Sequence, residues 1–175
     1  MKEAYPQKAV FFDRDGTLIV NVPYNGDPEN VTLMPGAVET CRLLHAAGFC
    51  MFIISNQSGV GRGLITEEQV TLVNERTLDL LGRELFTAVY YCLDDPNRPV
   101  SGCRKPSPSM LLTAHKEYGI DLQASFMVGD KEEDVQAGRA AGCRTVRLLQ
   151  ETGESAADFT ASSLYEAVQW ILSFE

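Results

Sequence analysis

The amino-acid sequence predicts an α/β fold, a Rossmann-like three-layer sandwich with a mainly parallel central sheet, on the basis of three observations. Short, largely apolar runs alternate along the chain with longer amphipathic segments, as strands and helices do in a covered parallel sheet. Glycine, proline, serine and threonine mark the boundaries between the two kinds of segment. The chain has 175 residues, 45% of them hydrophobic, which suits one domain with its own core. We therefore expect a single domain over residues 1–175.

The expected strands are the short apolar runs. They cover residues 8–12, 49–54, 87–91, 126–128 and 145–148. Because helical patterns separate consecutive strands, the strands should lie parallel to one another, with helices covering both faces of the sheet.

The expected helices are recognised by residues typical of helix ends. They cover residues 35–47, 66–85, 107–118, 132–141 and 163–172. Thr66 and Gln69 have the spacing of a capping box. Ser107 followed by Pro108 suits an N-cap and the first helical position. Glycine follows the first and fourth of these segments, as it does at many helix C-termini, and the last segment is amphipathic.

The overall charge argues against two classes of partner. The net charge is −9 and the pI is about 4.7. Nucleic acids and anionic membrane surfaces are both bound through basic faces, so neither is an expected partner. No apolar run approaches the roughly 18 residues that span a bilayer, and residues 1–8 show no signal-peptide core. We expect a cytoplasmic protein.

The cysteines show no disulfide framework. Cys41, Cys50, Cys92, Cys103 and Cys143 are odd in number and widely scattered. In a cytoplasmic chain such cysteines are expected to be free thiols.

Two acidic residues follow the first expected strand directly. Asp13 and Asp15 are separated by one residue, so both side chains point the same way if the extended geometry continues. Two carboxylates this close repel each other unless a cation or a shared proton offsets the repulsion. This segment therefore predicts a metal site.

Further polar residues lie at the ends of later expected strands and before one helix. These residues are Ser55, Asn56 and Gln57, then Arg104 and Lys105, then Asp130, Lys131 and Asp134. In a parallel sheet all of them converge on one edge. Carboxylates there suit Mg²⁺, and the cations and turn amides suit a phosphate group. Asp134 is expected to support the first turn of its own helix in preference to binding metal.

The order of these motifs resembles a known superfamily. Asp-x-Asp-Gly-Thr at 13–17, Ser-Asn-Gln at 55–57, a lone Lys105 before a helix and Gly-Asp-x-x-x-Asp at 129–134 are similar to the four motifs of the haloacid dehalogenase superfamily of phosphatases. Residues 55–63, 103–106 and 128–134 further resemble the heptose bisphosphate and histidinol-phosphate phosphatase branch.

This resemblance implies a mechanism. Asp13 would attack phosphorus and form an aspartyl-phosphate, Asp15 would act as acid and base, and Ser55 and Lys105 would stabilise the transferring phosphoryl group. Asp13, Asp15 and Asp130 would hold Mg²⁺, and a phosphorylated sugar would be the substrate. The residues expected to bind that substrate are Arg14, Asn21, Val22, Pro23, Tyr24, Asn56, Gln57, Ser58, Arg104 and Lys131.

Two structural features of this family are expected to be missing. No segment between the motifs is long enough to form a cap domain, so loops 21–30 and 93–99 would determine specificity. Zinc-bearing relatives have four Cys or His ligands in the loop before the lysine. This chain offers only Cys92, Asp94 and Cys103, with Ser101 in place of a cysteine, so zinc is not expected.

Several functions stay open at this point. The leading hypothesis is a heptose 1,7-bisphosphate 7-phosphatase that works as a monomer. A histidinol-phosphate phosphatase shares the same motifs. A catalytically inactive phosphosugar-binding module is the alternative from another class. A nucleic-acid 3′-phosphatase is disfavoured by the net charge of −9.

Overall fold

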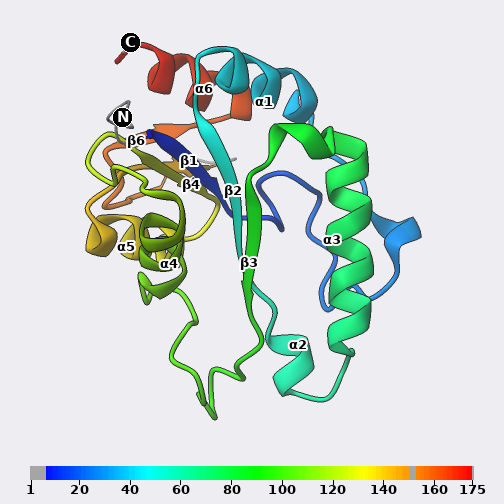
Figure 1. Cartoon of the computed structure of the whole chain (residues 1–175). Helices are drawn as coiled ribbons and strands as arrows, with labels where there is room; N and C mark the ends of the chain where they lie inside the picture. The colour runs from blue at the N-terminus through cyan, green and yellow to red at the C-terminus, as the bar shows by residue number, and fades with distance from the viewer. Residues whose placement is uncertain (1–6, 150–152, 175) are drawn as a thin grey trace, which may run out of the picture.

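The computed structural model describes residues 7–149 and 153–174 and confirms the predicted α/β fold (Figure 1). Its centre is a six-stranded sheet in the order β3-β2-β1-β4-β5-β6, with every pair of neighbours parallel. The strands are β1 (Ala9–Phe12), β2 (Cys50–Asn56), β3 (Ala88–Cys92), β4 (Phe126–Gly129), β5 (Arg144–Leu148) and β6 (Phe159–Ala161).

Helices cover both faces of the sheet. The α-helices are α1 (Ala37–Ala46), α2 (Ser58–Gly61), α3 (Glu67–Leu81), α4 (Ser109–Tyr118), α5 (Glu132–Ala141) and α6 (Leu164–Leu172), with short 3₁₀ turns η1 (Pro28–Asn30) and η2 (Arg83–Leu85). Alternate residues of β1 enter two separate cores. Val10 and Phe12 pack with α1, α3 and α6, whereas Ala9 and Phe11 pack with α4 and α5. The result is the three-layer sandwich that the sequence predicts.

The strand order determines where the loops meet. Strand β1 lies between β2 and β4, and the chain builds outward from it in both directions. This reversal creates a crevice outside the carboxyl ends of the central strands, where ligands of open α/β sheets bind. Asp13 follows β1 there, and its backbone N–H donates to the carbonyl of Val128 at 2.9 Å.

Several expected boundaries are wrong. Helix α3, expected over residues 66–85, ends at Leu81 because Gly82 with φ 102° leaves the helical conformation. Helix α4 begins at Ser109 with Pro108 in the N-cap position, so the Ser107 cap is misplaced. Helix α2 and strand β6 are not anticipated at all. The capping box is confirmed: Thr66 Oγ1 accepts from the Gln69 N–H at 3.2 Å, and the Gln69 side chain accepts from the Thr66 N–H at 2.9 Å.

Among residues 7–149 and 153–174, no helix combines the length and apolar character needed to cross a bilayer.

Candidate active site

A cavity of about 240 Å³ opens at the carboxyl edge of the sheet, where the sequence predicts a site. It brings together segments from the loop after β1, the start of α2, the loop before α4 and the start of α5. The predicted residues that line it are Asp13, Arg14, Asp15, Asn21, Val22, Pro23, Tyr24, Asn56, Gln57, Ser58, Arg104, Lys105 and Lys131.

Two predicted residues lie outside this lining. Ser55 is fully buried, and its Oγ accepts from the Gln57 side chain at 2.7 Å. Asp130 lies beside Gly16 and lines a neighbouring cavity of about 820 Å³. The Asp130 carboxylate nevertheless belongs to the same group of acids as Asp13.

Lys105 is a buried cation at the centre of the acidic residues Asp13 and Asp134. Its side chain is almost fully buried, and its Nζ lies 2.7 Å from Asp13 Oδ1 and 2.6 Å from Asp134 Oδ1. The same Nζ donates to the carbonyl of Ile54 at 2.7 Å. Burial alone would lower the pKa of Lys105, but the charges of Asp13 and Asp134 raise it above its ordinary value. Lys105 therefore stays protonated beside the predicted nucleophile.

Three carboxylates, two of them paired with Lys105, form an acidic group in the site. Asp13, Asp130 and Asp134 each offer an oxygen, and these oxygens lie within 4.8 Å of one another. Burial, followed by the charge of Asp13, raises the pKa of Asp130 to about 7 and that of Asp134 to about 6. Asp130 Oδ1 is buried without a hydrogen-bond partner. An orphaned carboxylate oxygen in a crowded acidic group fits a divalent cation with oxygen ligands.

Asp134 has the expected capping role and one that sequence reasoning missed. Its Oδ2 accepts from the backbone N–H of Lys131 at 3.0 Å, which supports the first turn of α5. Its Oδ1 pairs with Lys105. Asp134 thus uses both oxygens within the protein, whereas Asp130 keeps one available.

Gly16 explains why glycine follows the acidic pair. Its φ is 82°, and a Cβ at this position would lie 2.4 Å from Asp130 Oδ2. Only glycine permits both the positive φ and this close approach. The turn therefore brings the segment after β1 directly against the carboxylate after β4.

The side chains of Gln57, at the start of α2, and of the neighbouring Arg14 fix the Asp15 carboxylate. Gln57 Nε2 donates to Asp15 Oδ2 at 2.8 Å, and Arg14 Nε donates to the same oxygen at 3.0 Å. Arg14 Nη1 donates to Asn74 Oδ1 on α3 at 2.6 Å, and the residue is only 1% exposed. Arg14 thus borders the cavity while its guanidinium is committed to Asp15 and Asn74.

The rim of the cavity contains a contact that sequence reasoning missed. Tyr24 has φ 51°, and its hydroxyl accepts from Arg62 Nη1 at 2.9 Å. Arg62 Nε lies 3.6 Å from Asp95 on the loop after β3. Arg62 belongs to the polar run after β2, but nothing in that run indicated its partners.

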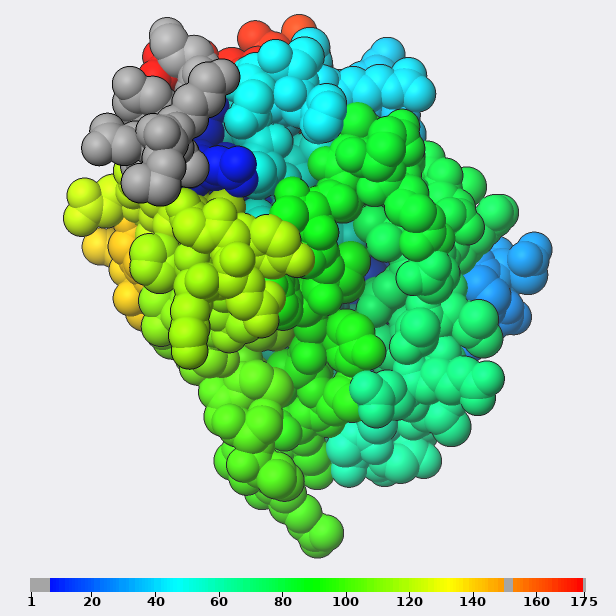
Figure 2. Space-filling view, in the orientation of Figure 1, coloured from blue at the N-terminus to red at the C-terminus, as the bar shows by residue number. Residues whose placement is uncertain are grey.

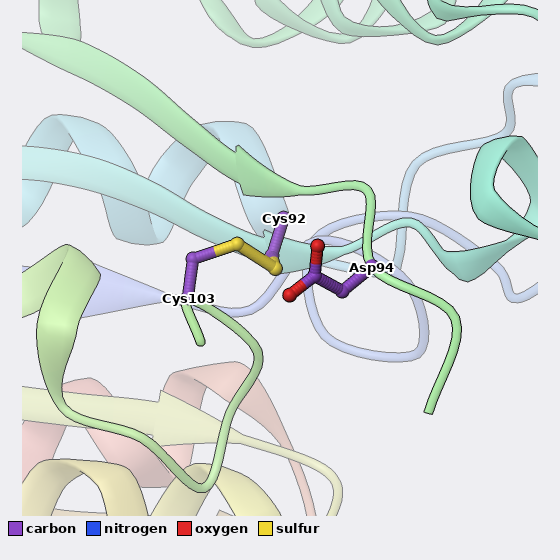
Figure 3. Close-up of side chains that lie close together, drawn as sticks. All are labelled: Cys92, Asp94 and Cys103. Atoms are coloured by element: carbon purple, nitrogen blue, oxygen red, sulfur yellow. A yellow bond between two sulfur atoms is a disulfide. The ribbon is translucent and has the colours of Figure 1, made fainter. Parts of the chain in front are cut away.

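The expectation of free thiols is wrong for one pair. Cys92 and Cys103 form a disulfide, with their Cα atoms 5.5 Å apart (Figure 3). The loop after β3 returns past the end of that strand, which brings together two residues that are 11 positions apart. Cys41, Cys50 and Cys143 are free. Asp94 lies beside the disulfide, but bonded sulfurs are not thiolate ligands, so this set does not fit zinc.

Comparison with known proteins shows which family this chain is similar to. Residues 23–142 match the profile of the haloacid dehalogenase-like hydrolases. The chain is 39% identical to the D-glycero-beta-D-manno-heptose-1,7-bisphosphate 7-phosphatase of Yersinia pestis over 89% of this chain and 90% of that protein. It is also 39% identical to the enzyme of that name from Escherichia coli K12, over 93% of both.

A solved structure shares the fold. The D,D-heptose 1,7-bisphosphate phosphatase of B. bronchiseptica, complexed with magnesium and phosphate, superposes with a TM-score of 0.84 and 24% identity. The match covers 97% of this chain and 100% of that one. With the profile match and the 39% identity over most of its length, the chain belongs to the haloacid dehalogenase-like hydrolases.

Proposed function

We propose that this chain is a Mg²⁺-dependent phosphatase that removes the 7-phosphate of D-glycero-D-manno-heptose 1,7-bisphosphate through an aspartyl-phosphate. The observation that carries the proposal is the contact between Asp13 and the protonated Lys105 at the base of an open polar cavity. A carboxylate nucleophile held against a fixed cation suits phosphoryl transfer, where positioning and charge stabilisation provide most of the catalysis. The relatives at 39% identity bear the name of this activity.

The residues would share the work as follows. An Asp13 oxygen attacks phosphorus, and the bond to the sugar oxygen breaks as Asp15 protonates that oxygen. Asp15 then takes a proton from the water that hydrolyses the aspartyl-phosphate, releasing inorganic phosphate. Gln57 and Arg14 hold the Asp15 carboxylate for both proton transfers. Lys105 and Ser55 stabilise the charge on the transferring phosphoryl group.

Mg²⁺ would be held by the Asp13 and Asp130 carboxylates and the backbone carbonyl of Asp15. When bound, it supplies positive charge for the carboxylates and for the oxygens of the phosphoryl group. The buried, unpartnered Asp130 Oδ1 supports this assignment.

The sugar side of the substrate would be bound by the rim of the cavity. Arg104 and Lys131 are cations of the lining, suited to a second phosphate, and Asn56 and Ser58 offer neutral hydrogen-bonding groups. The segment of residues 21–24 would contact the sugar. We further propose that the enzyme acts as a cytoplasmic monomer.

The proposal is tested by phosphate release from heptose 1,7-bisphosphate, other phosphorylated sugars and histidinol phosphate. We expect preference for the heptose bisphosphate and complete loss of turnover in chelator, restored by added Mg²⁺. If histidinol phosphate alone is hydrolysed, the proposed mechanism is supported but the proposed substrate is wrong. Phosphosugar binding with no turnover of any compound would show a binding module instead.

Arg104→Ala should weaken binding of the bisphosphate more than it slows the chemistry. Losing a charge-assisted contact to a phosphate corresponds to about a 10–100-fold rise in KM. Steady-state kinetics should show this rise with the heptose bisphosphate and a much smaller one with a heptose monophosphate.

Arg98→Ala is the matched control for Arg104, because Arg98 is an exposed arginine of the same loop that does not line the cavity. It should leave KM unchanged. Equal effects of Arg104→Ala on both substrates would contradict a role in binding the second phosphate.

A further inference from the structure

The loop between β3 and α4, residues 93–108, leads directly into the active site while projecting from the protein. It extends below the sheet in Figure 1, and in the space-filling view it forms the narrow green ridge at the lower end of the molecule (Figures 1 and 2). Val100 in this loop is 91% exposed. A loop with so little packing needs other interactions to fix the path of its backbone.

The two catalytic-site cations at the end of this loop are held very differently. Lys105 is anchored on both sides: its backbone N–H donates to Asn56 Oδ1 at 3.0 Å, and its carbonyl accepts from Asn56 Nδ2 at 3.1 Å. Its ammonium is fixed by Asp13 and Asp134. Among residues 7–149 and 153–174, the partner of the Arg104 guanidinium is the partly exposed Glu133, at 3.9 Å. The Arg104 carbonyl accepts from the Ser107 N–H at 2.9 Å, so the turn that follows fixes the backbone on one side of Arg104. The position of Arg104 then depends on how the backbone that precedes it is held.

That backbone is closed by what we call the clip: the Cys92–Cys103 disulfide and the Asp94 carboxylate. Cys92 is the last residue of β3, and Cys103 immediately precedes Arg104. Asp94 Oδ2 accepts from the N–H of Ser101 at 2.9 Å, from its hydroxyl at 3.0 Å and from the Gly102 N–H at 3.0 Å. Figure 3 shows the carboxylate beside the disulfide.

We propose that the clip positions Arg104, so that reduction of the Cys92–Cys103 bond lowers substrate affinity and reoxidation restores it. The proposal rests on the function proposed above. Because Asp94 keeps its hydrogen bonds in the reduced protein, reduction should loosen the loop without releasing it completely. The anchored Lys105 keeps its place in both states. The expected signature is a rise in KM with little change in kcat.

The chemistry is thiol–disulfide exchange. A dithiol reductant attacks Cys103, the more exposed sulfur, since Cys92 is 1% exposed. The Cys92–Cys103 bond breaks, both sulfurs end as thiols, and the reductant becomes its own disulfide, with two electrons and two protons transferred. A small disulfide such as glutathione disulfide reverses the reaction. Disulfides that occur in reducing compartments are typically transient and redox-sensing.

The test compares the air-oxidised enzyme with the enzyme reduced by dithiothreitol, both with saturating Mg²⁺. Reduction should raise KM for the heptose bisphosphate about tenfold and leave kcat within about twofold, as expected for a binding group displaced by a fraction of an ångström. Glutathione disulfide should restore KM. The double variant Cys92→Ser/Cys103→Ser should have the KM of the reduced enzyme under both conditions. Cys50→Ser, a control at a free cysteine, should respond like the parent.

Three results would overturn the proposal. The first is the detection of five alkylatable thiols in the denatured, air-oxidised protein, which would mean that no disulfide forms. The second is a KM that does not change on reduction. The third is recovery of the original KM when the reduced protein binds one zinc ion per chain. The last result would show that the loop is a metal site.

Hydrogen exchange over residues 100–106 separates this proposal from the proposed function. If no phosphate ester is hydrolysed, the proposed function fails, but faster exchange on reduction still supports the clip. Unchanged exchange overturns the clip whatever the activity.

Discussion

Replacing Asp13 with asparagine is expected to abolish phosphate release while the protein stays folded. An amide cannot form the acyl phosphate that a carboxylate forms, so the first chemical step has no nucleophile. Asp13→Asn should lower kcat by at least about 10⁴-fold, measured as inorganic phosphate released from the heptose bisphosphate. The loss should occur with every phosphate ester, because it concerns the phosphoryl group and not the sugar.

The same substitution should leave the stability of the metal-free protein intact. Asparagine removes one partner of Lys105, but Lys105 keeps its ion pair with Asp134 at 2.6 Å and is not left without a counter-charge. Besides burial, the charge of Asp13 raises the pKa values of Asp130 and Asp134, and asparagine removes that repulsion. The Tm in chelator should stay close to that of the parent. Asp79→Asn makes the same change on the exposed surface of α3 and should retain full turnover. Turnover by Asp13→Asn within about a hundredfold of the parent would contradict its assignment as the nucleophile.

Lys105→Met is expected to damage both catalysis and stability. It leaves two buried carboxylates, Asp13 and Asp134, without their cation. Breaking a buried ion pair from one side costs about 3–5 kcal/mol, which urea unfolding in chelator should measure. The loss of transition-state charge stabilisation should lower kcat by about 10²–10³-fold. Lys116→Met, at an exposed lysine of α4, is the matched control and should change neither quantity.

The stability difference should depend on pH in a defined direction. The pKa of Asp134 is raised by burial and by the charge of Asp13, whereas Lys105 lowers it, so the pKa rises further in Lys105→Met. A carboxyl group with a raised pKa costs stability as pH increases through that pKa, because ionisation is then unfavourable in the folded state. Lys105 in the parent stays charged beyond its ordinary pKa of 10.5. The difference in the free energy of unfolding between the parent and Lys105→Met should be large near pH 8 and smaller near about pH 5. Equal differences at the two pH values would show that Lys105 does not stabilise the ionised form of Asp134.

Hydrophobic runs are enough to predict five of the six strands, but two short elements, β6 and α2, give no usable signal in the sequence. Strand β6 has three residues, Phe159–Ala161, too few to show a strand pattern, and it forms because it pairs with β5. Helix α2, Ser58–Gly61, contains two glycines in four residues, which favour loops. Contacts from elsewhere determine its place: the Gly61 N–H donates to the carbonyl of Leu93, and a Cβ on Gly61 would lie 2.5 Å from the backbone of Asp95.

The sequence predicts which residues meet at the site but not which of their side chains contact one another. Asp13 and Asp130 follow parallel strands, and Lys105 lies in the loop between β3 and α4 at the same edge, so topology alone indicates the group. The Asp134–Lys105 ion pair and the inward turn of Arg14 toward Asn74 depend on side-chain packing between segments far apart in the chain. The Cys92–Cys103 bond likewise depends on the return path of a loop, which cysteine counting cannot show.

The hydrogen bond from the Asp13 N–H to Val128 makes the proposed nucleophile an extension of the sheet itself. The residues proposed to select the substrate, such as Tyr24 and Arg104, lie instead on loops at the rim of the cavity. Sequence changes in those loops can therefore accumulate without moving the bond-forming atoms. In the evolution of such a protein, the substrate specificity can change while the phosphoryl-transfer reaction stays the same.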